Sequence, residues 1–214
     1  MTTFPVILSA PSGGGKTTIA RELLNVRADV GYSVSCTTRK PRMGEVEGTD
    51  YYFLSRPAFR DAIDRGDFAE AAQVHGDFYG TLLREVERVR GEGRHVVMDI
   101  DVQGARQLVR TYPESVLIFV LPPSTGVLLE RLGSRRTEDP EALSRRLTSA
   151  IEELRAVPLY DYVVINDDLR SAVEKVGSII DAESARRVRA PELDARVERM
   201  IEELRTVVAT QSRD

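Results

Sequence analysis

A short apolar run, followed at once by a glycine-rich turn and an amphipathic segment, restricts the fold of this chain more than any other feature. The run is Val6-Ile7-Leu8, and the turn reads Ser9-Ala10-Pro11-Ser12-Gly13-Gly14-Gly15-Lys16-Thr17-Thr18. Glycines let backbone N–H groups curl inward around an anion, where a Cβ would often be in the way. A buried strand, this turn and a helix together predict a phosphate-binding loop for a nucleoside triphosphate.

Two side chains of the turn fit the same ligand. Lys16 supplies a point charge for the outer phosphates, and Thr17 supplies a hydroxyl for Mg²⁺. The turn departs from the pattern G-x-x-x-x-G-K-[ST] at its first position, where Ala10 adds a methyl group to the expected glycine. The alternative is an ordinary glycine-rich turn with a surface lysine, and the order of strand, glycines, Lys-Thr and helix disfavours it.

Length and composition predict one compact α/β unit in a reducing compartment. The chain has 214 residues and a single cysteine, Cys36, so no intrachain disulfide can form. The net charge of −4 argues against a general nucleic-acid surface. No stretch approaches the ~20 apolar residues that cross a bilayer, and the first residues lack the features of a leader. We therefore expect a cytoplasmic protein whose partners include neither nucleic acid nor membrane.

Apolar runs and helical patterns alternate along most of the chain, which predicts a doubly wound parallel sheet. Strands are expected at 6–8, 32–34, 95–98, 116–121 and 162–165, and helices at 16–26, 82–91, 102–110, 124–132, 140–157 and 169–188. Segment 36–81 is too long and too rich in Tyr, Phe, Gly and charge for a simple crossover, so we expect a small lobe with strands near 51–54 and 70–74. The charged segment 133–139 is expected to be a lid.

The tail from Pro191 to Val208 carries an apolar stripe at helical spacing. Its members are Leu193, Val197, Ile201, Leu204 and Val207. A helix with such a stripe can pack in one of two ways. It can dock on the core of its own chain, which is the simpler arrangement, or it can pair with another subunit.

Acidic and basic residues mark two further places. Asp99 and Asp101 follow the apolar run 95–98, where an aspartate beside a phosphate loop orients Mg²⁺ or its water; Asp101 also fits a helix N-cap. Arg39 and Arg42 lie three positions apart, and their forked guanidinium groups suit a phosphate. The alternative for the arginines is a solvated basic turn.

Six motifs occur in the order seen in guanylate kinases, and the chain resembles that family to about residue 185. They are Ser-Ala-Pro-Ser-Gly-Gly-Gly-Lys-Thr from Ser9, Ser-Val-Ser-Cys-Thr-Thr-Arg-Lys-Pro-Arg-Met-Gly-Glu from Ser33, Gly-Thr-Asp-Tyr-Tyr-Phe from Gly48, Tyr-Gly-Thr from Tyr79, Asp-Ile-Asp-Val-Gln-Gly from Asp99 and Val-Ile-Asn-Asp-Asp from Val164. The resemblance implies a P-loop nucleoside monophosphate kinase fold, an α/β fold with a parallel sheet flanked by helices, an inserted GMP-binding lobe and a short lid. Alanine at the position of Ala10 is ordinary in bacterial members.

The resemblance implies ATP-dependent phosphorylation of GMP, and of dGMP, to GDP. Transfer would be direct and assisted by Mg²⁺, without a covalent intermediate. We accordingly expect a core at 1–35, 82–132 and 140–190, a GMP-binding lobe at 36–81 and a lid at 133–139. A C-terminal helix at 191–214 would be the element through which a homo-oligomer forms.

Roles for single residues follow from matching the motifs. GMP would be bound by Ser35, Arg39, Arg42, Glu45, Tyr51, Glu70, Tyr79, Thr81 and Asp101. ATP would be bound by Pro11, Ser12, Gly13, Gly14, Gly15, Lys16, Thr17, Thr18, Arg135 and Asn166. The implied catalytic residues are Lys16, Arg39, Asp99, Arg135 and Arg146, with Arg131 as a further arginine beside the lid. Thr17 and Asp99 would hold Mg²⁺, directly or through water.

Within the GMP set, Ser35, Glu70 and Thr81 would face the guanine. Guanine presents two donors, N1–H and the 2-amino group, and one carboxylate accepts both. Adenine cannot satisfy that carboxylate.

Two other functions stay open at this point. A noncatalytic guanylate-kinase-like module would use the lobe to bind a partner protein, but such modules typically have degraded phosphate loops, and Lys16, Thr17 and Asp99 are present here. A kinase of the same fold could instead act on another small phosphate, such as a ribose phosphate. The guanine-facing set disfavours this, because a sugar phosphate has no purine edge to read.

Overall fold

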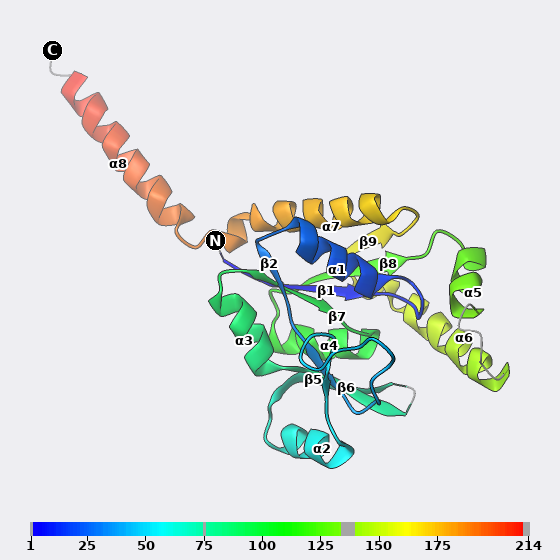
Figure 1. Cartoon of the computed structure of the whole chain (residues 1–214). Helices are drawn as coiled ribbons and strands as arrows, with labels where there is room; N and C mark the ends of the chain where they lie inside the picture. The colour runs from blue at the N-terminus through cyan, green and yellow to red at the C-terminus, as the bar shows by residue number, and fades with distance from the viewer. Residues whose placement is uncertain (1, 75, 134–139, 212–214) are drawn as a thin grey trace.

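The centre of the fold is a parallel sheet in which every strand except the edge strand Tyr162–Ile165 is largely buried. The structure is a computed structural model, and it describes residues 2–74, 76–133 and 140–211. Within these ranges five strands pair in parallel in the order β2-β7-β1-β8-β9 (Figure 1). Their bounds are β1 Pro5–Ser9, β2 Val30–Tyr32, β7 His95–Asp99, β8 Val116–Leu121 and β9 Tyr162–Ile165. The doubly wound sheet predicted from the apolar runs is confirmed.

Helices cover both faces of this sheet (Figure 1). One face carries α1 (Lys16–Val26) and α7 (Leu169–Ser184), and the other carries α3 (Leu83–Gly91) and α4 (Val102–Thr111). Successive strand residues point to opposite faces. Val6 and Leu8 of β1 therefore join the core under α1 and α7, whereas Ile7 joins the core under α3 and α4. Burial of β1 on both sides fixes the place where the phosphate loop starts.

A smaller sheet, antiparallel except for one parallel pair, stands beside the central one. Its order is β4-β3-β6-β5, with β3 Ser35–Thr37, β4 Tyr52–Phe53, β5 Phe68–Val74 and β6 Asp77–Leu82, and α2 (Arg56–Asp64) precedes β5. Only Ser33 and Val34 separate β2 from β3. The Ser33 N–H still donates to the carbonyl of Val97 in the central sheet (3.1 Å), and the Val34 N–H donates to the buried carboxylate of Glu85 (3.3 Å). This short junction fixes how the two sheets face each other.

The small sheet has a core of its own. Cys36, Phe59 and Leu82 are buried there. The ring of Phe59 stacks on Phe68 at 4.5 Å and on Phe78 at 5.5 Å between centroids. The buried Phe59 ring, with the partly buried rings of Phe68 and Phe78 packed against it, gives this part of the chain its own hydrophobic stabilisation.

Some local predictions were wrong or incomplete. The strand predicted at 32–34 is wrong, because the chain leaves one sheet at Tyr32 and enters the other at Ser35. Neither α2 nor β6 was predicted. The helix predicted at 140–157 ends earlier, since α6 spans Pro140–Arg155 and a short 3₁₀ helix, η1 (Val157–Leu159), follows it; Pro158 lacks the N–H that a continuing α-helix needs. The helix predicted at 124–132 is α5 (Thr125–Gly133).

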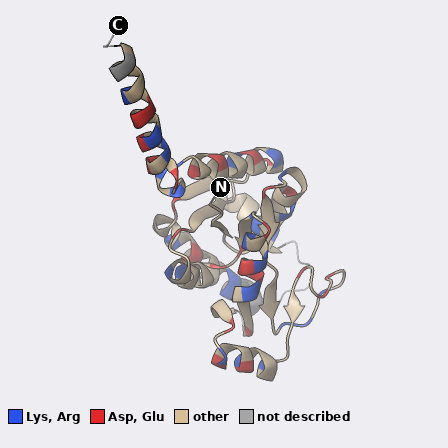
Figure 2. Cartoon of the chain, turned by 90° about the vertical axis from the view of Figure 1, so that its left-hand side faces the viewer, with Lys and Arg blue, Asp and Glu red and all other residues tan. Residues whose placement is uncertain are grey.

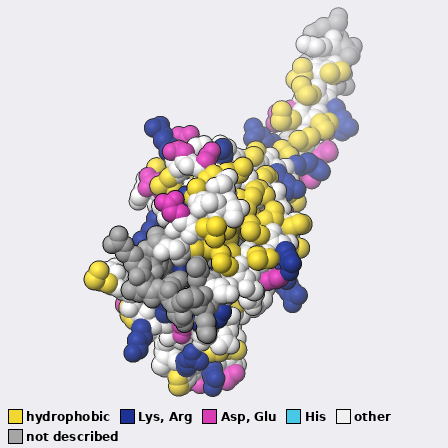
Figure 3. All heavy atoms as spheres, turned by 90° about the vertical axis from the view of Figure 1, so that its right-hand side faces the viewer, with side chains coloured by type: hydrophobic (Ala, Val, Ile, Leu, Met, Phe, Trp, Pro, Cys, Tyr) yellow, Lys and Arg dark blue, Asp and Glu magenta, His cyan; other side chains and the backbone are white. Residues whose placement is uncertain are grey.

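The C-terminal helix α8 (Leu193–Gln211) projects away from the body (Figures 1 and 2). Figure 2 shows acidic and basic residues distributed along it, and Figure 3 shows hydrophobic side chains on the same helix. The preceding 3₁₀ helix, η2 (Arg187–Arg189), is anchored because Arg189 pairs with Glu183 at 3.0 Å and lies 4.0 Å from the centre of the Phe4 ring. The predicted helix is confirmed, but it does not dock on its own core.

Two further expectations concern membrane-spanning helices and the lid. No helix within them is long and apolar enough to span a membrane. Segment 133–139, expected to be a lid, lies outside the described residues except for Gly133, and so does Arg135.

The separate core of the small sheet generates a stability prediction. Phe59→Ala should lower the free energy of unfolding by about 3 to 5 kcal/mol, because it removes a fully buried ring and leaves a cavity. Urea titration measures the change. The matched control on the same helix is Ile63→Ala, whose side chain is 43% exposed and whose cost should be about 0.5 kcal/mol. Equal losses in both variants would contradict the proposed core.

Candidate active site

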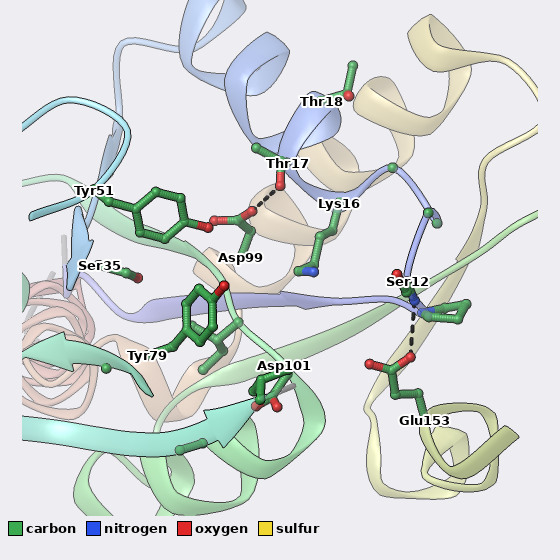
Figure 4. Close-up of a pocket in the computed structure, with 18 of the residues that line it drawn as sticks. Ser12, Lys16, Thr17, Thr18, Ser35, Tyr51, Tyr79, Asp99, Asp101 and Glu153 are labelled. Atoms are coloured by element: carbon green, nitrogen blue, oxygen red, sulfur yellow. Dashed lines mark hydrogen bonds between the residues drawn. The ribbon is translucent and has the colours of Figure 1, made fainter. Parts of the chain in front are cut away.

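A cavity of about 520 Å³ lies where the carboxyl ends of β1 and β7 meet the small sheet (Figure 4). In open α/β sheets this edge is where ligands bind. Predicted residues that line the cavity are Pro11 to Thr18, Ser35, Arg42, Tyr51, Glu70, Tyr79, Asp99 and Asp101, together with Arg131. Arg39, Glu45, Thr81, Arg146 and Asn166 do not line it but contact residues that do. The structure thus brings together residues from six separate sequence motifs.

The phosphate loop presents backbone donors to this cavity. Gly15 precedes α1 with φ +94°, and no side chain among the described residues caps the helix, so its first N–H groups remain available for an anion. A Cβ at Gly14 would lie 2.6 Å from the Cβ of Ala10, which makes glycine necessary there. The Lys16 side chain points into the cavity (Figure 4), and no hydrogen bond or ion pair holds its ammonium within the described ranges. This loop is therefore preorganised for phosphate.

Asp99 at the end of β7 faces the loop. Its carboxylate accepts hydrogen bonds from the hydroxyls of Thr17 and Tyr32, one on each oxygen. Burial and the Asp99 charge raise the pKa of Tyr32 well above its usual range, so that hydroxyl stays a donor. Within the described residues no cluster of three or more Asp, Glu, His or Cys residues is placed to hold a metal ion. One carboxylate and one hydroxyl fit Mg²⁺, which usually completes its shell with phosphates and water.

A buried carboxylate lies on the opposite wall. Glu70 of β5 is 5% exposed, and the Thr81 hydroxyl on β6 donates to it at 2.8 Å. Thr81 is paired in register with both Glu70 and Ser35, so three neighbouring strands bring these side chains to one level. A Cβ at Gly104 would lie 2.6 Å from a Glu70 oxygen. Burial raises the pKa of Glu70 to about 7.

Asp101 lies two residues after Asp99, between the predicted metal site and α4. It caps α4, since its side chain accepts the Gly104 N–H at 2.8 Å, while it also lines the cavity. The N-cap alternative is therefore confirmed for this residue, and its place in the cavity wall leaves a contact with a ligand open.

The arginine pair is organised by one acid. Both terminal nitrogens of Arg39 donate to the Glu45 carboxylate, at 2.9 and 2.8 Å, and the Arg42 N–H donates to it at 2.7 Å. Hydrogen bonds from Arg39 lower the pKa of Glu45. The Arg39 guanidinium also reaches the Tyr79 hydroxyl (3.3 Å) and lies 5.4 Å from the centre of the Tyr51 ring. These contacts hold the Arg39 side chain, whereas Arg42 is held through its backbone N–H and its side chain is exposed.

Two residues of helix α6 contact the phosphate loop, and only one of them was predicted from the sequence. Arg146, which was predicted, donates to the Ser12 hydroxyl at 3.3 Å. Glu153, which was not, accepts the Ser12 N–H at 3.0 Å, and burial raises its pKa (Figure 4). The two residues are seven positions apart, so they share a helix face; that spacing was the available signal. Asn166 donates to the Gly14 carbonyl at 3.0 Å and so braces the loop.

The pKa of Glu70 leads to a pH prediction. The folded state binds more protons than the unfolded state at pH values between about 4.3, the usual pKa of glutamate, and 7. The free energy of unfolding therefore falls as pH rises through this window. From pH 5 to pH 8 the wild type should lose roughly 1 to 3 kcal/mol of unfolding free energy relative to Glu70→Gln. The exposed Glu174→Gln is the control. A pH-independent difference would mean that the Glu70 carboxyl ionises freely.

Comparison with known proteins identifies the same architecture. The family model described as guanylate kinase matches residues 2–183. A guanylate kinase of Geobacter metallireducens is 47% identical over 186 residues, covering 87% of this chain and 92% of the relative, and one of Clostridium perfringens is 42% identical over 201 residues, covering 93% of each. The crystal structure of guanylate kinase from Anaplasma phagocytophilum superposes with a TM-score of 0.73 at 33% identity, covering 88% of this chain and 89% of that one. The resemblance in the motifs is confirmed, and the chain belongs to the guanylate kinase family.

Proposed function

We propose that this chain transfers the γ-phosphoryl group of ATP to GMP, giving ADP and GDP. The observation that carries the proposal is one cavity with a phosphate loop on one wall and a buried carboxylate, hydroxyls and Arg42 on the other. Membership of the guanylate kinase family supports it. Two nucleotides that enter such a cavity from opposite walls meet with their phosphates facing each other.

On the ATP side, the proposal assigns the triphosphate to the loop 11–18. Backbone N–H groups at the start of α1 and the Lys16 ammonium would bind the phosphate oxygens. Asn166 supports the loop from behind through its bond to the Gly14 carbonyl. Thr17 and Asp99 would hold Mg²⁺, directly or through water. When bound, the ion neutralises charge on the phosphates and orients them.

On the GMP side, we assign the base to Ser35, Glu70 and Thr81. A carboxylate at Glu70 accepts the N1–H and 2-amino donors of guanine, and the neighbouring hydroxyls serve the remaining edge. We assign the 5′-phosphate to Arg39, Arg42, Tyr51 and Tyr79, with Glu45 holding the arginines in place. None of these residues is assigned to the ribose 2′-hydroxyl, so the proposal includes dGMP.

The chemical step needs positioning rather than a covalent intermediate. An oxygen of the GMP phosphate attacks the γ-phosphorus, and the bond from that phosphorus to the ADP oxygen breaks with its electron pair leaving on ADP. The acceptor is already an anion, so no general base is required. Lys16, Arg39 and Arg146 would stabilise the charge on the transferring group. Segments 1–35, 82–132 and 140–190 form the core in this proposal, and 36–81 forms the GMP lobe.

Replacing the loop lysine separates chemistry from acceptor binding. Lys16→Met should lower kcat by at least about 100-fold, because an ammonium aimed at the transferring phosphates is lost. The GMP dissociation constant, measured by calorimetry, should stay within about twofold, since GMP is assigned to the opposite wall. Lys175→Met, on the exposed face of α7, is the control and should leave kcat unchanged. Normal turnover of Lys16→Met would remove this lysine from the mechanism.

The assignment of the base to Ser35, Glu70 and Thr81 predicts strong discrimination between purines. The kcat/KM for GMP should exceed that for AMP by about 10⁴ to 10⁵, because AMP leaves buried polar groups unpaired. Glu70→Gln should reduce the ratio mainly by weakening GMP, since one amide oxygen replaces two carboxylate oxygens. A coupled assay of ADP release measures kcat/KM with each nucleotide.

The exposed Glu174→Gln serves as the control and should keep the wild-type ratio. Similar kcat/KM values for GMP and AMP in the wild type would contradict the assignment of the base site.

A further inference from the structure

A glycine occupies the first turn of α4, at a position where alanine would favour the helix. Gly104 is the third residue of α4 and is buried. A glycine within a helix costs stability relative to alanine, because it loses more conformational freedom on folding. The φ of Gly104 lies outside the left-handed region, so the backbone does not require glycine here. The reason for the glycine is therefore the space around it.

The carboxyl group of Glu70 fills the space beside Gly104. A Cβ on Gly104 would lie 2.6 Å from Oε2 of Glu70 and 3.0 Å from its Cδ. The other carboxyl oxygen, Oε1, accepts the Thr81 hydroxyl at 2.8 Å. The missing side chain thus lets the Glu70 carboxyl lie against α4 while it stays bonded to Thr81.

Side chains further along α4 hold the helix against β5. The Gln107 side chain donates to the Ala71 carbonyl at 3.0 Å and accepts the Ala71 N–H at 3.2 Å, and the Thr111 hydroxyl donates to the Ala69 carbonyl at 3.2 Å. Ala69 and Ala71 are the two neighbours of Glu70 in the sequence. Because β5 is an edge strand of the small sheet, these bonds take the place of those that a further strand would make.

The opposite side of α4 is buried against the central sheet (Figure 1). Ala105 and Leu108 pack there in one cluster with Ile7 of β1 and Met98 of β7. The helix is therefore fixed on two sides, whereas the Glu70 carboxyl is the end of a flexible side chain that lines the cavity. A methyl group added at position 104 would displace the carboxyl toward the cavity and leave the helix in place.

We propose that Gly104 is a positioning residue for the Glu70 carboxyl and thereby determines selectivity for guanine. The room that it leaves beside α4 keeps both carboxyl oxygens where the two donors of the base would meet them. This inference rests on the proposed function, because the base is assigned there to Ser35, Glu70 and Thr81. It makes a helix of the core part of the device that selects the acceptor.

Kinetics of Gly104→Ala test the proposal by adding one methyl group. The KM for GMP should rise about 10- to 100-fold, because a displaced carboxyl no longer pairs with both guanine donors. The kcat should stay within about threefold, since the lost contact is the same in the ground state and the transition state. The kcat/KM for AMP should change little, because adenine does not pair with this carboxylate.

The matched control is Gly91→Ala at the end of α3, where a Cβ meets nothing within 4 Å. It should keep the wild-type ratio of kcat/KM for GMP to kcat/KM for AMP. A wild-type ratio in Gly104→Ala would overturn the proposal.

A double-mutant cycle shows whether the effect passes through Glu70 or through Asp101, whose Oδ1 would lie 3.3 Å from the same Cβ. In the Glu70→Ala background, adding Gly104→Ala should change the KM for GMP by less than about twofold, because the displaced group is absent. It should also raise the melting temperature, as alanine does in a helix that has room for it. A second tenfold rise in KM would mean that Gly104 acts through Asp101 and would overturn the proposal.

The position of the carboxyl can also be measured without a nucleotide, by a ¹³C NMR titration of Glu70 assigned with Glu70→Gln. Burial raises the pKa of Glu70 to about 7, and the Asp101 charge adds to the rise. In Gly104→Ala the carboxyl lies nearer to water, so its pKa should fall by about 1 or more. An equal pKa in both proteins would overturn the proposal even where the wild type prefers GMP. A wild type without that preference would instead refute the proposed base site, and the lower pKa would still show that Gly104 positions Glu70.

Discussion

The junction between the two sheets is the constraint on which the site depends. Two residues, Ser33 and Val34, carry the chain from β2 to β3, and their N–H groups are tied to the central sheet and to the buried Glu85. A longer or unpaired link would let the small sheet drift. Because the link is short, the wall that carries Glu70 stands across one cavity from the phosphate loop. The two walls that the proposal assigns to the two nucleotides therefore belong to one cavity.

Chemistry at local motifs was predictable from the sequence, and contacts between distant segments were not. The strand, turn and helix around Lys16 form one contiguous pattern, and α1 has the predicted bounds. Tyr32 reaches Asp99 only because β2 lies beside β7 in the sheet, an order that no local pattern shows. The strand at 32–34 was wrong for the same reason: apolar periodicity does not show where a chain passes from one sheet to another. Segment 191–208 was predicted as a helix, but its apolar stripe does not show that the helix projects from the body (Figure 1).

The burial of Glu70 affects both the folding free energy of the protein and the proposed recognition of the base. The carboxyl is buried beside Thr81 without an ion pair in the described residues, which raises its pKa and costs folding free energy at neutral pH. In the proposed complex guanine would supply the two missing donors, so the same cost would become a penalty for any base that lacks them. The Asp99 site follows a similar logic, because its carboxylate is held by two hydroxyls and by no basic side chain in the described residues. Each wall of the cavity thus carries a carboxylate, Glu70 or Asp99, that has no basic partner in the described residues.

The central claim is that the two nucleotides face each other and exchange the phosphoryl group directly. The stereochemical course at phosphorus tests it most directly. ATP made chiral at its γ-phosphorus with sulfur and oxygen isotopes is reacted with GMP, and the configuration of the transferred group in the product is determined by ³¹P spectroscopy. One in-line displacement predicts inversion. Retention would require two displacements through a phosphorylated side chain and would contradict the account.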